Sequence, residues 1–392
     1  LGRKINTKNS RIYFKLKLIF YVTYNDAPSG IYSSQVIDVV KFLNIELKAD
    51  VKLVSFISIR NYFKNRSKIK KELPQAIVIP MVPGIHRWRW NLIFLYFLCL
   101  LFNPKVIIGR SVLATQLALK CKKGKMRIIY DGRGAIAAEW KEYNVVTNSR
   151  MLSEIPILEK DVVLNADYRI AVSNNLLEYW KQEYGYTSHK HVVIPCTLNK
   201  VFENIDLNSE IIASKRKSLN MHSTDIVFVY SGSIAGWQSF DLLYKFISPI
   251  LKSFPNSKLL FLSDRDSNIV KLENEFPNRI LQKMVSPQNV PEYLMIADYG
   301  LLIREQSVTN KVASPVKFPE YLSCGLKIII SENLGDYSEF VSKNQCGYLH
   351  KDFQNEQFSS LSAEKRKTNQ MLALHHFVKS HFLSSYKYLI NN

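Results

Sequence analysis

One lysine and one glutamate interrupt an otherwise apolar segment, ASPVKFPEYLSCGLKIII, which covers residues 313–330. Pro315 suits the first turn of a helix and Ser314 suits its N-cap, so the free N–H groups that follow would attract an anion. Lys317 adds a full positive charge there, and Glu320, one helical turn later, could accept hydrogen bonds from sugar hydroxyls. The alternative is that Lys317 and Glu320 only pair with each other across the turn.

A glycine turn, SGSIAGWQSF, is a second candidate for binding an anion. It follows an apolar, strand-like run and leads into a helix that we expect to start near Gln238. Gly232 lets the backbone approach a ligand closely, and a helix start offers N–H groups to phosphate. The turn is neither a G-x-G-x-x-G dinucleotide motif nor a P-loop, because no GK[ST] occurs. A plain turn glycine explains it about as well.

Acidic and basic side chains also follow the expected strand end in IIYDGRGAIAAEW. Asp131 stands where a general base or a ligand of an acceptor hydroxyl is expected, and Arg133 could clamp a phosphate with two hydrogen bonds. With Glu139 they form the predicted catalytic group. The alternative is a structural Asp/Arg pair that braces glycine-rich backbone. Of the eight histidines, His86 is the one candidate for catalysis, and a surface histidine is the alternative.

The sequence predicts neither a metal site nor a disulfide framework. No D-x-D motif and no His/carboxylate cluster with metal-ligand spacing is present, so cations of the protein would replace a divalent metal. The five cysteines show no CxxC pair, which argues against zinc and fits a reducing cytosol. They are Cys99, Cys121, Cys196, Cys324 and Cys346.

Strand-like runs alternate with helix-length segments along the chain, a rhythm that favours parallel sheets covered by helices. The 392 residues, 47% of them hydrophobic, exceed what one core usually holds, so we expect two α/β domains with a boundary just after VVIPCTLN. The expected strands of the first half lie near residues 18–24, 51–56, 76–79, 106–108, 128–130, 168–172 and 191–194. Those of the second half lie near residues 226–230, 258–262, 299–303 and 327–331.

Positive charge is concentrated in the first half of the chain. Residues 1–200 hold 32 Lys+Arg against 14 Asp+Glu, a balance of +18, whereas residues 201–392 hold 21 against 19, a balance of +2. Such a field attracts nucleic acid, an anionic membrane or a phosphate-bearing substrate, or it only keeps the surface solvated. No nucleic-acid recognition motif is visible, so we expect no nucleic-acid partner. CKKGKMR and KNRSKIKK are the two basic runs.

The segment from His86 to Lys105 is unusually apolar, and Asn91 is the one polar residue from Trp90 to Phe102. Thirteen residues are too few for a membrane span, which needs ~20. Two interpretations remain. Either the segment is a helix buried between strands, or it is an interfacial helix that places Trp88, Arg89 and Trp90 at the level of lipid headgroups.

Four stretches together resemble glycosyltransferase family 4 and its relatives of the GT-B fold. The most specific is ADYGLLIREQSVTNKVASPVKFPEYLSCGLKIIIS, which is similar to the donor-binding core of that family; the others are NDAPSGIYSSQVIDVVKFL, ADYRIAVSNNLLEYW and VVIPCTLN. The resemblance implies two Rossmann-like domains that face each other across a cleft. Residues 1–200 would hold the acceptor, residues 201–375 a nucleotide-sugar donor, and residues 376–392 a helix that returns to the first domain.

The resemblance also implies roles for individual residues. Glu320 would hold the ribose hydroxyls of the donor. The remaining donor-binding residues implied are Gly30, Gly232, Ser233, Arg304, Ser314, Pro315, Val316 and Lys317. Two positions depart from the family pattern: Val312 replaces a second glutamate, with Arg304 and Glu305 upstream, and Trp237 and Gln238 stand where a basic residue is usual. Arg304, Lys311 or Lys317 would then supply the missing charge.

The activity implied is sugar transfer that retains the anomeric configuration and needs no cofactor besides the nucleotide sugar. The acceptor would be a glycan or a lipid-linked glycan in cell-surface polysaccharide synthesis. The enzyme would be cytoplasmic and peripherally bound to the anionic inner face of the membrane. A catalytically inactive GT-B subunit that binds a ligand or a partner is the alternative.

Overall fold

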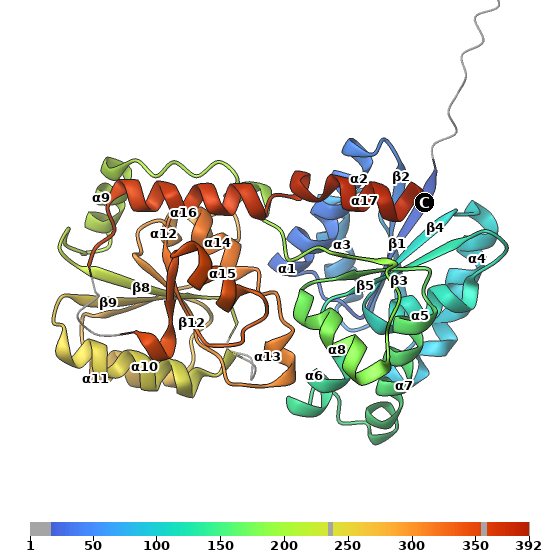
Figure 1. The fold of residues 1–392 in the computed structure, drawn as a ribbon, viewed down its shortest axis with the longest axis horizontal. Coiled ribbons are helices and arrows are strands. Elements are labelled where there is room, and N and C mark those ends of the chain that lie inside the picture. The colour runs from blue at the N-terminus through green and yellow to red at the C-terminus, as the bar shows by residue number, and fades with distance from the viewer. Residues whose placement is uncertain (1–16, 234–237, 354–358, 392) are drawn as a thin grey trace, which may run out of the picture.

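A computed structural model describes residues 17–233, 238–353 and 359–391 of the chain, which form two α/β domains side by side (Figure 1). The N-terminal domain contains a seven-stranded sheet in the order β3-β2-β1-β4-β5-β6-β7, in which every neighbouring pair is parallel. Its strands are β1 (Leu18–Tyr24), β2 (Asp50–Ser58), β3 (Ile77–Met81), β4 (Val106–Arg110), β5 (Arg127–Gly132), β6 (Tyr168–Ala171) and β7 (His191–Val193).

The C-terminal domain contains a six-stranded parallel sheet in the order β10-β9-β8-β11-β12-β13. Its strands are β8 (Ile226–Ser231), β9 (Ser257–Leu262), β10 (Ile280–Lys283), β11 (Tyr299–Leu302), β12 (Lys327–Ile330) and β13 (Gly347–Leu349). All eleven strands expected from the sequence are present. The two that were missed, β10 and β13, are the short, half-buried edges of this sheet, and such strands lack a long apolar run.

Helices cover both faces of each sheet, because the central parallel strands are buried on both sides. In the N-terminal domain they are α1 (Gly30–Tyr32), the π-helix η1 (Ser33–Ile37), α2 (Asp38–Glu46), α3 (Tyr62–Glu72), η2 (Ile85–Asn91), α4 (Leu92–Phe102), α5 (Ser111–Cys121), α6 (Ile136–Glu142), α7 (Ser149–Asn165) and α8 (Asn174–Tyr184). In the C-terminal domain they are η3 (Lys200–Phe202), α9 (Ser209–Ser218), α10 (Phe240–Ser253), α11 (Ser267–Glu275), α12 (Val290–Leu294), α13 (Val308–Lys311), α14 (Lys317–Ser323), α15 (Tyr337–Asn344), η5 (His350–Asp352) and α16 (Ala363–His376).

The end of the chain returns to the first domain. In Figure 1, α16 runs along the C-terminal domain, and η7 (Lys379–Phe382) and α17 (Leu383–Asn391) continue over the N-terminal one. Leu389 and Ile390 of α17 are buried in the core that also holds β1 and β2, and Arg127 Nη1 donates to the carbonyl oxygens of both residues, at 3.1 and 3.0 Å. The last helix therefore ties the two domains together.

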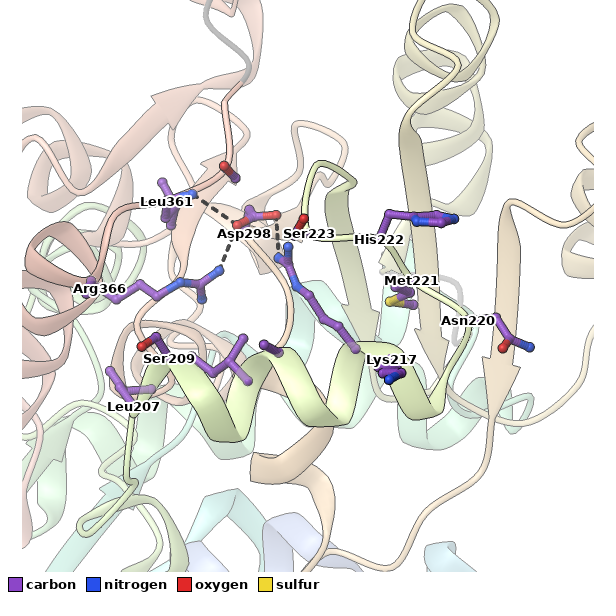
Figure 2. A pocket seen from close by; sticks show the side chains of 15 residues that line it. Leu207, Ser209, Lys217, Asn220, Met221, His222, Ser223, Asp298, Leu361 and Arg366 are labelled. Carbon is purple, nitrogen blue, oxygen red and sulfur yellow. Dashed lines mark hydrogen bonds and ion pairs between the residues drawn. The ribbon is translucent and has the colours of Figure 1, made fainter.

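Both AD sequences of the resemblance place an aspartate just before a strand. Asp298 accepts the backbone N–H of Val227 at 2.9 Å, and Asp167 accepts that of Ile128 at 2.8 Å, so each joins its strand to the neighbouring one. Arg216 of α9 and Arg366 of α16 pair with Asp298 at 2.8 and 2.7 Å, and Figure 2 shows Arg366 pointing toward this carboxylate. These three residues line a cavity of about 650 Å³. The Asp298 carboxylate also accepts the backbone N–H of Leu361, so both of its oxygens have hydrogen-bond donors.

The apolar segment forms η2 and α4 at the surface and is not buried between strands. Leu95 and Cys99 are the buried residues of α4, while most of its other side chains are exposed. Trp88 is fully buried, so its expected place at a headgroup level was wrong, whereas Trp90 is exposed. Within the described residues, no helix is long and apolar enough to cross a membrane.

Candidate active site

A cavity of about 640 Å³ lies between the two domains, at the carboxyl ends of the parallel strands. This is where open α/β sheets bind ligands, and the size suits a small molecule. Six of the residues predicted for donor binding line it: Gly30, Gly232, Ser233, Val316, Lys317 and Glu320.

Gly30 begins α1 on the N-terminal side of the cavity. Ser29 caps this helix by accepting a hydrogen bond from Tyr32 N at 3.2 Å. A Cβ atom added at Gly30 would lie 3.9 Å from Pro287 Cγ of the other domain. The glycine loop therefore faces the C-terminal wall directly.

Gly232 follows β8 on the opposite wall and has φ +115°, a conformation that favours glycine. A Cβ atom here would lie 2.7 Å from Lys317 Cε, so the absence of a side chain lets Lys317 lie against the turn. Ser233 is held by Tyr230, whose hydroxyl donates to its carbonyl oxygen at 2.5 Å. Trp237 lies outside the described residues, and α10 begins at Phe240, two residues after the expected start.

Two cations share one amide oxygen beside this turn. Lys317 Nζ and Arg304 Nη2 both donate to Gln238 Oε1, at 3.1 and 3.2 Å. Lys317 Nζ also lies 4.0 Å from the ring centroid of Tyr230, and Arg304 Nη1 donates to Asn310 Oδ1 at 3.3 Å. Among the described residues, no carboxylate forms an ion pair with either cation. Burial is the main cause of the lowered pKa of Lys317, and the nearby positive charge of Arg304 lowers it further. The geometry is one that an anionic ligand would stabilise.

Glu320 lies one helical turn beyond Lys317 and also lines the cavity. Burial raises its pKa to about 8, and the Lys317 charge opposes this shift. No ion pair joins the two side chains in the described part of the structure, so they do not simply satisfy each other. The carboxyl group remains available to hydrogen-bond the hydroxyls of a ligand.

Ser314 does not cap a helix, and this prediction was wrong. The following helix, α14, starts at Lys317 with Val316 in the cap position and no side-chain cap. Ser314 Oγ instead accepts from Cys196 N at 2.9 Å and bonds to Tyr337 Oη at 2.8 Å. Its hydroxyl therefore joins the interdomain segment to the C-terminal domain. Neither Ser314 nor Pro315 lines the cavity.

The contacts of Asp131 are with residues of the N-terminal domain. Asp131 is fully buried, accepts the Tyr21 hydroxyl at 2.5 Å, pairs with Arg133 Nε at 2.8 Å and lies 3.7 Å from Arg110 Nη1. Arg110 Nε also pairs with Asp26 at 3.5 Å. Neither Asp131 nor Arg133 lines the interdomain cavity, so the geometry matches the structural Asp/Arg pair and does not favour a base at Asp131.

Glu139 and His86 do not join Asp131. Glu139 lies on α6, where burial and then the neighbouring Glu142 raise its pKa. Glu142 itself caps α13 across the domain interface, because its carboxylate accepts from Val308 N at 2.9 Å and Thr309 N at 3.0 Å. His86 is exposed on η2, away from the cavity lining. The predicted catalytic residues are thus not brought together at the cavity.

Of the positions that depart from the family pattern, Gln238 lines the cavity and Val312 does not. Val312 is buried in the core of the N-terminal domain, and its carbonyl oxygen accepts the Ser173 hydroxyl at 2.8 Å. Lys311 and Glu305 are exposed. Of the candidates for the missing positive charge, Arg304 and Lys317 meet at Gln238 and Lys311 does not.

Sequence reasoning missed several polar residues of the cavity. Asp38, Glu72 and Asn199 line it from the N-terminal side, and Asp38 Oδ2 is buried with no hydrogen-bond partner among the described residues. Burial is also the first cause of the raised pKa of Asp38. These residues sit in separate segments with no shared motif, so no spacing could reveal them. Within the described residues, no group of three or more His, Cys, Asp or Glu side chains could hold a metal ion.

Solved structures are similar over nearly the whole chain. A glycosyltransferase from Rickettsia africae ESF-5 has a TM-score of 0.71 at 16% identity, covering 97% of this chain and 100% of that one. Anabaena HepE, in complex with UDP, has a TM-score of 0.70 at 12% identity, covering 96% and 100%. The chain has the GT-B fold. WaaG, a glycosyltransferase involved in lipopolysaccharide biosynthesis, shares this GT-B arrangement with a TM-score of 0.63 at 12% identity, covering 95% and 98%. No family model and no curated protein sequence matches the chain.

Proposed function

We propose that this GT-B protein is a retaining glycosyltransferase that moves a sugar from a nucleotide-diphosphate donor to a glycan or lipid-linked acceptor. The observation that carries the proposal is that Lys317, which lines the cavity, and the buried Arg304 share the amide oxygen of Gln238, with no carboxylate partner among the described residues. A fold alone hosts many activities, so the argument rests on this site. HepE, which shares the fold, binds UDP and UDP-glucose.

The chemistry follows from where the charges lie. Negative charge develops on the leaving diphosphate during transfer. Fixed cations stabilise this charge best where no anion of the protein already neutralises them. Glu320 would accept hydrogen bonds from the donor's ribose hydroxyls, while Gly232 and Gly30 let both walls approach the donor. The cations would serve in place of a divalent metal. The leaving diphosphate would help to deprotonate the acceptor hydroxyl.

The acceptor and location belong to the same proposal. A lipid-linked glycan of cell-surface polysaccharide synthesis keeps its tail in the bilayer, so the enzyme would work in the cytoplasm, bound peripherally to the inner face of the membrane. The strongly basic N-terminal half supports this placement. An inactive binding subunit is the second candidate, because Val312 is buried where many family members carry a glutamate.

A thermal-shift screen with UDP-, GDP-, CMP- and dTDP-sugars tests donor binding. A donor that binds only the folded protein raises the melting temperature, and Lys317→Ala and Glu320→Gln should each reduce the rise. Equal shifts in the wild type and both variants would contradict the assigned site.

Turnover then separates the two candidates. We expect transfer that survives excess EDTA, with a product whose anomeric configuration, read by NMR, is that of the donor. Inversion, or activity lost on chelation and restored by Mg²⁺ or Mn²⁺, would contradict the mechanism. Donor binding without turnover over a panel of lipid-linked and soluble acceptors would favour the inactive subunit.

A further inference from the structure

The outer side of α4 exposes a group of large apolar side chains. Seven of its eleven residues are exposed large hydrophobics, and Trp90 of η2 extends the same area. Contiguous apolar patches of this kind mark interaction sites. We call this area the α4 surface: Trp90, Ile93, Phe94, Tyr96, Phe97, Leu100, Leu101 and Phe102.

These side chains are ordered along one stripe. Ile93, Phe97 and Leu101 are spaced four residues apart and so point the same way, with 61% of Phe97 and 75% of Leu101 exposed. Leu95 and Cys99, also four apart, form the opposite, buried stripe. In Figure 1, α4 lies on the edge of the N-terminal domain that is remote from the C-terminal domain. The α4 surface therefore leaves the cleft free.

Lysines from other elements border the stripe. Lys123 Nζ donates to the Tyr96 hydroxyl at 2.8 Å and lies 4.1 Å from its ring centroid. Lys125 is exposed in the same turn as Lys123. Lys52 Nζ lies 5.9 Å from the ring centroid of Phe102 but also pairs with Asp50 at 3.3 Å, so its charge is partly neutralised. An apolar stripe bordered by cations is the pattern of a helix lying in the headgroup region of a bilayer.

Not every basic residue of the sequence contributes to this border. Lys122 pairs with Asp167 at 2.6 Å, and Arg89 pairs with Glu154, so their charges are partly neutralised. The run KNRSKIKK forms most of α3, whose buried Ile69 belongs to the core on the other face of the sheet from Leu95. The two basic runs thus do not share one face.

We propose that the α4 surface docks on an anionic lipid bilayer and inserts Trp90, Phe97 and Leu101 among the lipid headgroups. With eleven residues α4 is too short to cross the bilayer, which leaves shallow insertion parallel to the surface. A second copy of the chain fits less well, because it would bring the same lysines face to face. Docking does not require sugar transfer, but it would bring the proposed active site to a lipid-linked acceptor.

Vesicle cosedimentation tests this proposal directly. The full-length protein should pellet with vesicles of phosphatidylcholine and phosphatidylglycerol, and rising salt should weaken the binding. Phe97→Ser and Leu101→Ser should each weaken it on the order of tenfold. Phe63→Ser on α3, where the side chain is 83% exposed, is the matched control and should leave it unchanged.

Charge variants test the border separately. Lys123→Gln and Lys125→Gln should weaken binding roughly fivefold each, whereas Lys64→Gln and Lys68→Gln on α3 should have little effect. Lys122→Gln should have a smaller effect than Lys123→Gln, because Lys122 is already paired.

Trp90 reports the depth of insertion. Lipids brominated near the headgroup should quench its fluorescence on binding, and Trp90→Phe should remove that quenching. Equal pelleting with neutral and anionic vesicles, or none with either, would overturn the proposal. So would a dimer in solution that Leu101→Ser dissociates while vesicles are not bound. Donor binding, measured in parallel by thermal shift, shows whether the active site is intact in each variant.

Discussion

Two clusters of buried cationic side chains near the carboxyl ends of strands differ in whether they contain an anion. In the N-terminal domain, Arg133 and Arg110 surround Asp131, which also accepts the Tyr21 hydroxyl. In the C-terminal domain, Arg304 and Lys317 share the neutral amide oxygen of Gln238. The residue types are similar, but one cluster carries its own anion and the other does not.

This difference distinguishes a structural ion-pair cluster from a ligand-binding cluster. A buried cation costs free energy unless an opposite charge or a set of hydrogen bonds compensates it. The Asp131 cluster compensates its arginines within the protein and does not line the interdomain cavity. At the Gln238 cluster, no carboxylate of the described residues forms an ion pair with Arg304 or Lys317, and Lys317 lines the cavity. A ligand anion can therefore add stability only at the second cluster.

The largest expected effect on the catalytic rate comes from Lys317→Met. Methionine retains an apolar stem, so the fold should be as stable as before or slightly more stable, because a buried charge is removed. Loss of one group that stabilises the developing charge should lower kcat/KM by ~10²–10³-fold. Lys311→Met, at an exposed position of α13, is the control. An unchanged kcat/KM of Lys317→Met in steady-state kinetics would contradict the assignment of the Gln238 cluster as a binding site.

Asp131→Asn should have its main effect on stability. Removing the charge leaves the buried Arg133 without its anion and Arg110 with Asp26 alone, so the free energy of unfolding should fall by ~3–5 kcal/mol in urea titrations. Tyr21→Phe, which removes one hydrogen bond to the carboxylate, should cost about 1.5–3 kcal/mol and keep the variant folded. Donor affinity should stay the same in both. Normal stability with lost transfer would instead support the catalytic role predicted from the sequence.

Glu320→Gln should have a moderate effect on the donor alone. Above pH 8, where Glu320 is ionised, losing its charge-assisted hydrogen bonds to the ribose should weaken donor binding by ~1–3 kcal/mol in titration calorimetry. Glu305→Gln, at an exposed position, is the matched control. An unchanged affinity in Glu320→Gln would remove the carboxylate from the donor site.

A further expected effect is a change in the pH dependence of stability. Burial raises the pKa of Glu320 to about 8 from an ordinary value of 4.5, so between these values the folded protein holds a proton that the unfolded chain releases. The contribution of Glu320 to the free energy of unfolding therefore falls as the pH rises from 4.5 to 8. Glu320→Gln removes this contribution and should flatten the pH profile of urea unfolding. An identical slope in wild type and variant would show that Glu320 is solvated in the folded state.

The sequence by itself determined the alternation of strands and helices. Runs such as IVFVY and KIII are apolar without a break, because central parallel strands are buried on both faces, and they were predicted correctly. The GT-B arrangement followed from four motifs that span both domains. Only the half-buried edges, β10 and β13, escaped, because an edge strand needs no continuous apolar run.

The tertiary structure alone decided which charges are free and which apolar residues are exposed. Sequence showed Asp131 beside Arg133 but not that Tyr21 and Arg110, from β1 and β4, enclose the same carboxylate. Nor could it show that Gln238 bridges Arg304 and Lys317. Trp88 and Trp90 are two residues apart, yet one is buried and the other 69% exposed. Pairing and burial depend on neighbours that the fold brings from distant segments, and local spacing carries no record of them.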